Sequence, residues 1–457
     1  MKSKTKYLIW STVSSLPLLF LFQNFTRTPA NANVCDSAKI QEILEPASEQ
    51  KPNVAVRCNL TLQASDKVSK RLIIQSSKAS NITIDCQNAL IDGGSVNRGK
   101  DIISISSSAI KDTAGNISKW DRPENVTVKN CRVVGAIRVS GMATNGEGVH
   151  LRDSSRSENH TARSQAAAPK NIKFTNMKIT GENRIPFYVS PGVTYLTLEN
   201  SEISGTSSSV AIYLDAESAH NTIRNNYVHT STEKRELIAI DGSAFNAITG
   251  NRFSALNHGG IYLYRNCGEG GTIRHQTPSH NQIINNSFYY DKYSGSNPAI
   301  FLASRNGKRI YCSADNGYPF GSSADNRDFA RYNVIVYNQF VKLSAEKMIR
   351  LDDSPNFLHE NTTVDSVITR KSACYMPNGY PNDIIQNGKS IESILSNGYP
   401  ICDGQKYTCE DGVILKSPIS CPGRRPQSET TDCSASVNDT QGFSPLRALR
   451  FPTPYCY

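Results

Sequence analysis

The sequence predicts an all-β fold, a single-stranded right-handed parallel β-helix with an N-terminal cap and a Cys-rich C-terminal segment. Two repeats predict it. In the first, an aliphatic and a polar residue precede a turn position, usually Asn, and an apolar residue follows three positions later. In mid-chain this position recurs every 24 or 25 residues. It is occupied by Asn130, Asn176, Asn200, Asn225, Gly250, Asn285 and Tyr337. The flanking apolar–polar alternation is typical of strands, and a fixed period of this size indicates stacked coils.

The second repeat is another alternating strand between these copies. On a strand, the central aliphatic points inward and its two neighbours point outward. The copies are His150-Leu151-Arg152, Tyr188-Val189-Ser190, Tyr213-Leu214-Asp215, Ala239-Ile240-Asp241, Tyr262-Leu263-Tyr264, Phe301-Leu302-Ala303 and Arg350-Leu351-Asp352. Because neighbouring coils lie about 4.8 Å apart, the outward residues form a strip. We expect this strip to contain Arg152, Tyr188, Tyr213, Asp215, Asp241, Tyr262, Tyr264 and Arg350. Aromatic and charged groups in a row suit an extended sugar polymer.

The repeated Asn residues are expected to be scaffold. Asn tolerates a left-handed backbone and bonds its own main chain, so inward-pointing Asn side chains at coil turns predict a structural amide ladder. This interpretation applies to Asn130, Asn176, Asn200, Asn225 and Asn285.

The chain divides into four parts. Residues 1–32 have a basic start, an apolar stretch at 16–22 and the small-residue sequence Ala30-Asn31-Ala32, which predict a cleaved signal peptide. Residues 33–58 are an N-terminal cap, 59–364 the parallel β-helix, and 365–457 a Cys-rich cap or appendage. The mature protein is expected to be secreted, periplasmic or extracellular, and to have no membrane partner after signal removal.

Twelve cysteines in an exported chain predict disulfides, although the sequence does not fix their connectivity. Cys35 and Cys58 bracket a segment, 38–44, that suits a helix covering the first coil. A bridge between Cys267 and Cys312 would tie two long insertions together. Removing the four basic residues of the signal peptide lowers the formal net charge from +10 to +6. No basic run with interleaved aromatics accompanies it, so no nucleic-acid partner is expected.

Three segments interrupt the regular coils. The stretch from Asp153 to Lys170 is rich in Ser, Ala and Arg and predicts a flexible loop. Two insertions, 266–280 and 304–331, follow the outward strip and are rich in Gly, Asn and Asp. Long loops in a tight solenoid often carry function. Because these two loops emerge just after the strip, we expect them to form the walls of a groove.

The chemistry is expected at Asp215 and Asp241, which occupy equivalent outward positions on adjacent coils. Their carboxylates would lie about 5 Å apart, so that one pKa rises or a cation such as Ca²⁺ lies between them. The pair would suit retaining glycoside hydrolysis, a divalent-cation site or acid–base catalysis. Strand-end Asp residues are also common turn-starters, and Asp241-Gly242 is a turn dipeptide.

Other candidates surround this pair. Tyr262 and Tyr264 point outward and are expected to contact ligand. Arg265 would neutralise a substrate carboxylate or form a surface ion pair with Asp241. His258 precedes a Gly-Gly turn, where a structural and a catalytic role are both open. Glu217 and Glu269 are weaker candidates.

These repeats resemble the secreted right-handed β-helix proteins that act on polysaccharides, including pectate-lyase-like proteins, polygalacturonase-type hydrolases and mannuronan epimerases. The resemblance covers residues 59–364. Asn257-His258-Gly259-Gly260 is similar to the His element of the hydrolases, without their preceding Asp pair. Tyr213 and Asp215 are similar to the Tyr and first Asp of the epimerase signature, without its Pro and His.

The strip and the resemblance together predict a polysaccharide lyase or epimerase whose partner is an acidic, uronate-containing polymer. Arg265, or a cation on Asp215 and Asp241, would neutralise the uronate. Tyr213, Tyr262 or His258 would be base and acid. Substrate would also contact Arg152, Tyr188, Tyr264 and Arg350. The alternatives are a glycoside hydrolase using Asp215 and Asp241 and a non-catalytic carbohydrate-binding or adhesive solenoid, to which abutting carboxylates bring no gain.

Overall fold

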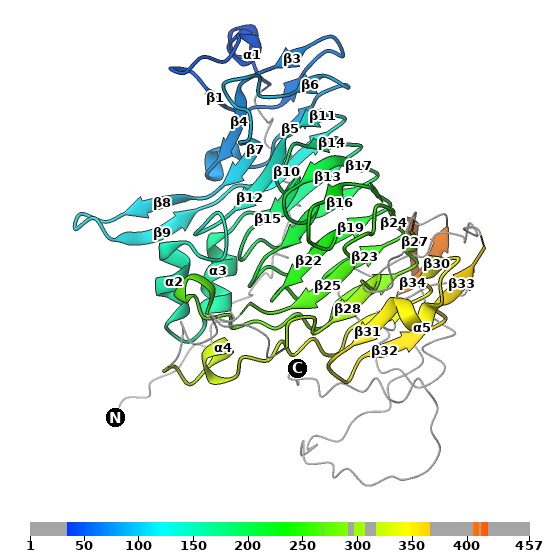
Figure 1. The fold of residues 1–457 in the computed structure, drawn as a ribbon. Coiled ribbons are helices and arrows are strands. Elements are labelled where there is room, and N and C mark those ends of the chain that lie inside the picture. Colours follow the sequence, from blue (N-terminus) through cyan, green and yellow to red (C-terminus); the bar gives the residue numbers. More distant parts are fainter. Residues whose placement is uncertain are drawn as a thin grey trace, which may run out of the picture.

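The computed structural model describes residues 34–266, 268–290, 297–306 and 317–365, together with the backbone of two later strands. Successive coils stack along one axis, and each coil contributes one short strand to each of three parallel sheets (Figure 1). This arrangement confirms the predicted single-stranded parallel β-helix. In the described ranges, no helix is long and apolar enough to cross a membrane.

The first sheet carries the strip predicted from the sequence. Its strands, in order, are β1 (Asn53–Ala55), β4 (Arg71–Gln75), β7 (Asp101–Ser106), β12 (Ala136–Ser140), β15 (Phe187–Val189), β18 (Ile212–Leu214), β22 (Ile238–Asp241), β25 (Ile261–Tyr264), β28 (Ile300–Leu302) and β31 (Ile349–Leu351). Tyr188 pairs with Tyr213, and Val189 with Leu214. Leu214 pairs in turn with Ile240. The register of these coils is therefore the predicted one.

The other two sheets complete each coil. The second consists of β2 (Leu60–Thr61), β5 (Thr83–Asp85), β10 (Glu124–Lys129), β13 (Lys170–Thr175), β16 (Thr197–Glu199), β19 (Thr222–Arg224), β23 (Ala247–Thr249), β26 (Gln282–Ile284), β29 (Val334–Val336) and β32 (Phe357–His359). The third consists of β3 (Lys67–Val68), β6 (Leu90–Ile91), β11 (Arg132–Val134), β14 (Lys178–Gly181), β17 (Glu202–Ser207), β20 (Tyr227–Val228), β24 (Arg252–Phe253), β27 (Ser287–Tyr289), β30 (Gln339–Val341) and β33 (Thr362–Val364), with β21 (Ser231–Thr232) paired to β17.

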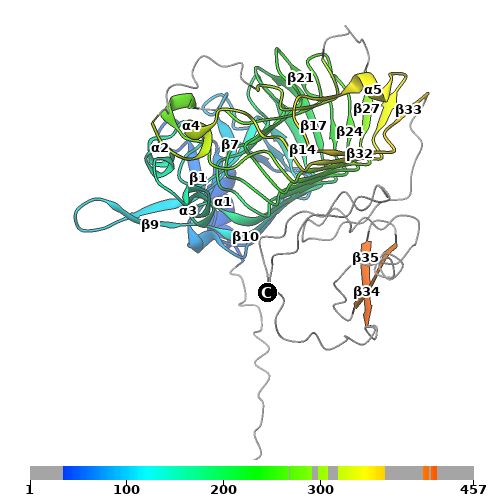
Figure 2. The same ribbon diagram turned by 90° about the horizontal axis from the view of Figure 1, so that it is seen from below.

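The remaining elements lie outside the coils. They are α1 (Ser37–Leu44), η1 (Ser77–Ala79), the antiparallel pair β8 (Ser108–Lys111) and β9 (Ile117–Asp121), α2 (Val149–Ser155), α3 (His160–Ala167), η2 (Glu269–Gly271), α4 (Gly321–Ala324), α5 (Ala345–Met348) and the antiparallel pair β34 (Gln405–Glu410) and β35 (Val413–Pro418). Figures 1 and 2 show α2, α3 and α4 together beside the first sheet.

Inward side chains of the three sheets fill one continuous core. Ile212, Leu214 and Ile240 are fully buried within it. Aromatic rings also stack from coil to coil, as between Phe253 and Phe288, whose centroids lie 5.1 Å apart. Each coil thus buries its apolar face only against its neighbours, as stacked repeats do.

The predicted turn role of the repeated Asn residues is confirmed. Asn130, Asn176, Asn200, Asn225 and Asn285 all have positive φ, between 50° and 57°. Their predicted inward orientation is wrong, because they are half-buried or exposed at the turns.

The buried amide ladder is formed by the residues that follow. Asn226 donates to Asn251, and Asn251 donates to Asn286. The left-handed turn residue points out, so the next side chain enters the core and satisfies backbone groups there.

Replacing Asn251 with Ala is expected to lower the free energy of unfolding by about 2–4 kcal/mol, because several buried groups lose their partners. Asn251 Oδ1 accepts from the amide N–H of Asn226, and its Nδ2 donates to the carbonyl of Ile223. Asn225→Gly is the matched control. Gly250 occupies that same turn position one coil later, so this change is expected to be nearly neutral. Urea unfolding of both variants measures the difference, and equal midpoints would contradict the assigned role of Asn251.

The segment between Cys35 and Cys58 contains the expected helix, α1. Asp36 caps α1 by accepting from the backbone N–H of Lys39 at 2.8 Å, and α1 buries Ile43. Cys35 and Cys58 form a disulfide beside it.

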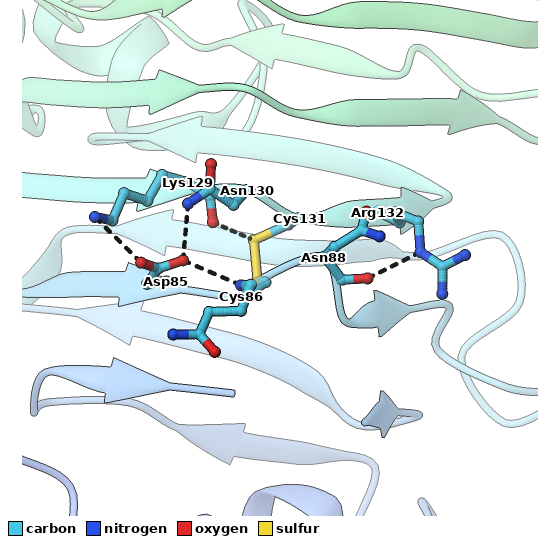
Figure 3. The surroundings of a disulfide bond; sticks show 8 residues. Asp85, Cys86, Asn88, Lys129, Asn130, Cys131 and Arg132 are labelled. Carbon is cyan, nitrogen blue, oxygen red and sulfur yellow. Dashed lines mark hydrogen bonds and ion pairs between the residues drawn. A yellow bond between two sulfur atoms is a disulfide. The ribbon is translucent and has the colours of Figure 1, made fainter. Parts of the chain in front are cut away.

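A second disulfide joins consecutive turns of the early coils. It links Cys86 and Cys131, beside Asp85, which accepts from the Asn130 amide at 2.9 Å (Figure 3). The predictions for residues 1–32, for Cys267 and Cys312, and for nearly all of 366–457 fall outside the described residues.

Two further local predictions are wrong. Residues 153–170 are largely helical, and His150-Leu151-Arg152 belongs to α2 instead of a strand. The buried residues of α3 are His160, Ser164 and Ala167, a helical spacing carried by polar and small side chains that gave no apolar period. The strand that precedes Tyr188 in the first sheet is β12, in which Arg138 is the partner of Tyr188.

Candidate active site

A cavity of about 430 Å³ lies over the outer face of the first sheet. Its lining contains five arginines and four carboxyl groups. The arginines are Arg138, Arg184, Arg235, Arg274 and Arg305, and the carboxyl groups belong to Asp101, Glu147, Asp215 and Glu269. So many charged groups in one concave site favour a polar or charged ligand.

The floor of the cavity is built from the strip, and its walls come from loops. Tyr188 and Tyr213 stand on adjacent coils with parallel rings, 4.9 Å between centroids. Residues 144–147, which follow β12, form one wall. The first insertion forms another with Asn266, Glu269 and Arg274, as expected for a loop emerging beside the strip.

Each of the two predicted aspartates accepts a hydrogen bond from the tyrosine of the preceding coil. Tyr188 Oη donates to Asp215 Oδ2 at 2.6 Å, and Tyr213 Oη donates to Asp241 Oδ2 at 2.7 Å. All four side chains are buried, so the strip is covered at this level. The phenol donors offset part of the cost of two buried carboxyl groups on adjacent coils.

Asp215 lines the cavity and has a strongly shifted pKa. Burial raises the pKa of its carboxyl group to about 6, against the opposing effect of Arg274 and with a further raising effect from Asp241. Arg274 Nη1 lies 3.9 Å from Asp215 Oδ1. That nitrogen is buried and has no hydrogen-bond partner among the described residues. An N–H donor of Arg274 therefore lies next to the Asp215 carboxyl group, which titrates near neutral pH.

Asp241 lies beneath the cavity and does not fit a calcium site. Its Oδ1 accepts from the backbone N–H of Asn266, and its Oδ2 from the Asn266 amide as well as from Tyr213, with both Asn266 bonds at 2.7 Å. Asp215 likewise accepts on both oxygens, the second bond coming from Ala216 N–H at 2.8 Å. With these oxygens engaged by donors and a guanidinium beside Asp215, the donor set does not match the all-oxygen cage that Ca²⁺ requires.

Glu269 is the second carboxyl group of the cavity with a raised pKa. Burial raises the pKa most, followed by the charge of Asp241. Its Oε2 accepts from the Asn266 amide at 2.8 Å, so Asn266 joins Glu269 to Asp241.

Two arginines converge on Tyr264 at one side of the cavity. Arg235 Nη2 donates to Tyr264 Oη at 2.6 Å, and Arg305 stacks over the ring at 3.9 Å. Arg235 is neutralised by Glu236 at 2.9 Å. Arg305 Nη1 donates to Asn266 Oδ1 at 2.6 Å, and within the described ranges it forms no ion pair with a carboxylate. Arg305 thus brings a positive charge to the cavity that a ligand can neutralise.

A second arginine pair stands at the opposite side. Arg138 and Arg184 share Asp101, at 2.8 and 3.1 Å. Arg138 also lies over the Tyr188 ring, 4.1 Å from its centroid. Asp101 can neutralise only one of the two guanidinium groups.

The wall that carries Arg274 is fastened by Glu217. This buried carboxylate accepts from the backbone N–H groups of His275 and Gln276, at 2.8 and 3.2 Å, and from the hydroxyl of Thr161 in α3. His160 packs against His275 with ring centroids 5.1 Å apart, and burial lowers the pKa of His160 to about 4. Glu217 therefore joins α3 to the arginine-bearing loop.

Gly146 gives Arg274 its space. A Cβ atom at this position would lie 2.0 Å from Arg274 Nη2 and 2.3 Å from Nη1. Any side chain at 146 would displace either the guanidinium or the 144–147 wall.

The structure brings together part of the predicted site. Tyr188, Tyr213 and Asp215 line the cavity, Asp241 lies directly behind it, and Tyr264 supports two of the arginines.

Five other predicted residues lie elsewhere. Arg152 is in α2, and Arg350, two coils beyond Tyr262, pairs with Asp352 and covers Phe301. His258 lies at a turn near Thr232, and Tyr262 packs edge-on against Phe301. Arg265 donates to the carbonyls of residues 274, 325 and 327.

The arginines that define the cavity were mostly missed from the sequence. Arg138 had a usable signal, since it stands in the alternating segment 136–140 one coil before Tyr188. Arg274 and Arg305 lie in or beside the insertions, where no period fixes a position.

Asp215 makes stability depend on pH in a specific direction. Its pKa in the folded protein, about 6, is above the ordinary Asp value of about 3.9. The folded state therefore binds the proton more tightly than the unfolded state does. The contribution of Asp215 to the free energy of unfolding falls as pH rises from about 4 to about 6. The advantage of Asp215→Asn over wild type is expected to grow by about 1–3 kcal/mol between pH 4 and pH 7. Urea unfolding at both pH values tests this, and a constant difference would contradict it.

Comparison with known proteins supports the fold. Residues 117–313 match the family model described as right handed beta helix region. A search of curated proteins found no match.

Solved structures similar to the chain, each at 12% identity, differ in the activities that their names state. The surface protein and adhesin PfbA of Streptococcus pneumoniae aligns over 71% of this chain and 91% of its own, with a TM-score of 0.37. The endo-xylogalacturonan hydrolase from Aspergillus tubingensis aligns over 67% and 85%, with a TM-score of 0.35. The periplasmic alginate epimerase AlgG aligns over 78% and 100%, with a TM-score of 0.26.

Proposed function

We propose that this protein is an exported enzyme that binds uronate residues of an acidic polysaccharide in the arginine-lined cavity and transfers a proton through Asp215, in a lyase or epimerase reaction. The observation that supports it most is the cavity itself. Five guanidinium groups line the same cavity as a buried carboxyl group whose pKa is raised to about 6.

The arginines account for the choice of an acidic polymer. Arg305 has no carboxylate partner among the described residues, and Arg138 shares Asp101 with Arg184. A uronate carboxylate would accept paired N–H bonds from such groups, which are stronger than bonds between neutral partners. A neutral sugar would leave Arg305 without a carboxylate partner.

The proposed proton transfer uses Asp215 as base. Pairing the uronate carboxylate with arginine lowers the cost of removing the proton on carbon 5. Above pH 6 the Asp215 carboxylate accepts that proton as the C5–H bond breaks. In elimination the electron pair forms the C4–C5 double bond, and the C4–O bond breaks with protonation of the leaving oxygen. In epimerisation a proton returns to carbon 5 from the opposite face.

The tyrosines are assigned as donors. Burial raises the pKa of Tyr188 and of Tyr213 well above the ordinary value, and each hydroxyl donates to an aspartate. Neutral phenols in this state do not serve as bases, so Tyr213 orients Asp241, and Tyr188 holds the Asp215 carboxylate.

Hydrolysis is the second candidate. Glu269 and Asp215 both line the cavity and both have raised pKa values, which suits an acid–base pair of carboxyl groups. In this reaction Glu269 would take the place expected from the sequence for Asp241.

The reaction class is tested with the mature protein and a panel of acidic and neutral polysaccharides. Absorbance near 235 nm and reducing ends are followed together, with and without EDTA. Rising absorbance on uronate polymers, unaffected by EDTA and lost in Asp215→Asn, supports a lyase. Reducing ends without absorbance support hydrolysis, and proton NMR of the unchanged polymer detects epimerisation. Activity confined to neutral polymers would contradict the proposal.

A further inference from the structure

Other side chains cover the aromatic rings of the outward strip. Tyr213 stacks on one face of Tyr188, with 4.9 Å between ring centroids, and the guanidinium carbon of Arg138 lies 4.1 Å from the Tyr188 centroid. These two partners come from the strands on either side of Tyr188, so both faces of its ring are occupied. Tyr188 is 7% exposed and Tyr213 8%. A sugar ring therefore cannot stack on Tyr188 unless part of the protein moves.

Two further rings of the strip are covered in the same way. Arg305 lies over Tyr264, with its guanidinium carbon 3.9 Å from the ring centroid, and Arg350 lies over Phe301 at 4.5 Å. Tyr264 is fully buried, and Phe301 is 8% exposed. An extended polymer that crosses successive coils needs open ring faces to stack on. At these coils the strip is therefore not an open platform for such a polymer.

The loops that follow β12 and β25 meet at one side of the cavity. A Cβ atom at Gly146 would lie 2.0 Å from Arg274 Nη2, and a Cβ atom at Gly270 would lie 2.8 Å from the Cβ of Glu147. In the first sheet, β15, β18 and β22 lie between β12 and β25. The two loops therefore bridge the coils of these three strands and close this side of the cavity.

We propose that the cavity binds the end of a polysaccharide chain or a short oligosaccharide, and not an internal stretch of a long polymer. An internal stretch would have to enter and leave, either along the strip across covered rings or through the contact between the two loops. A chain end needs only one opening. At about 430 Å³, the cavity is near the lower end of the volumes of ligand sites, about 300–1,000 Å³, which suits a few sugar units at most. Chain-end binding rests on the proposed function for the class of ligand.

Titration calorimetry with one polyuronate, cut to a series of chain lengths and compared at equal mass of uronate, tests chain-end binding. The Asp215→Asn variant is used to prevent turnover. One bound protein per chain is expected at every length, so the number of sites per gram falls in proportion to chain length. A constant number of sites per gram would overturn chain-end binding and leave the proposed function intact. Absence of binding to every chain, the shortest included, would overturn the proposed function and chain-end binding with it.

Two arginines that lie over rings of the strip provide matched variants. Arg305 lines the cavity, whereas Arg350 is not among its lining residues. Arg305→Gln is expected to weaken the binding of short and long chains by the same factor, and Arg350→Gln is expected to change neither affinity. A long chain lying along the strip would reach Phe301, so weaker binding of long chains alone in Arg350→Gln would contradict the proposal. Arg350 is half exposed and pairs with Asp352 at the surface, so its variant decides alone if Arg305→Gln fails to fold.

Discussion

Asp215→Asn is expected to lower kcat on a uronate polymer by about 10³-fold, in the middle of the range of general acid–base effects. The amide cannot accept the carbon-5 proton, yet its oxygen can still accept the bond from Tyr188. KM is expected to change little, because the arginines that hold the substrate remain. Steady-state kinetics measures both values.

Steady-state kinetics also distinguishes lyase or epimerase chemistry from hydrolysis. For a base with a pKa of about 6, kcat/KM rises with pH and levels off above pH 6. Glu269→Gln is the matched variant, since it also neutralises a carboxyl group of the cavity whose pKa is raised. A modest loss in Glu269→Gln supports lyase or epimerase chemistry, whereas a loss equal to that of Asp215→Asn supports hydrolysis. Full activity of Asp215→Asn would show that the proton is transferred elsewhere.

Gly146→Ala is expected to lower kcat/KM by about 10²-fold without unfolding the protein, because a misplaced guanidinium costs this much in a positioned site. The new Cβ would lie 2.0 Å from Arg274 Nη2, so either Arg274 leaves its place beside Asp215 or residues 144–147 shift. The chain at 146 belongs to a cavity wall outside the stacked core, which limits the effect on stability.

The double variant Gly146→Ala with Arg274→Gln is the control. If Gly146 acts only by making room for Arg274, the double variant is no less active than Arg274→Gln alone. Additive losses would mean that the wall itself moves and affects other groups.

The sequence predicted those features that repeat. The alternation around Val189, Leu214 and Ile240 determines which side chains enter the core, so the sheet register followed directly. The turn at Asn225 was also predictable from its backbone preference. The ladder formed by Asn226 and Asn251 was assigned one residue too early, because period alone does not show which of two adjacent Asn side chains points inward.

The candidate site was predictable only where it lies on the repeat. Asp215 and Asp241 are neighbours because their strands pair. Predicting their hydrogen bonds with tyrosines would require knowing in which direction along the strand each side chain points. Arg274 reaches the cavity through an insertion fastened to Glu217, a contact between residues far apart in the sequence. Helix α3 was missed because its buried face is polar and small.

The central claim is that the cavity recognises the carboxylate of a uronate polymer. The most direct measurement compares the mature protein on one polyuronate and on the same polymer after chemical reduction of its carboxyl groups to alcohols, by titration calorimetry with Asp215→Asn to prevent turnover. The arginine-lined cavity predicts binding of the polyuronate that weakens by about 10-fold or more on reduction, since charge-assisted hydrogen bonds contribute about 1.5–3 kcal/mol each. Equal affinity for the two polymers would contradict the account.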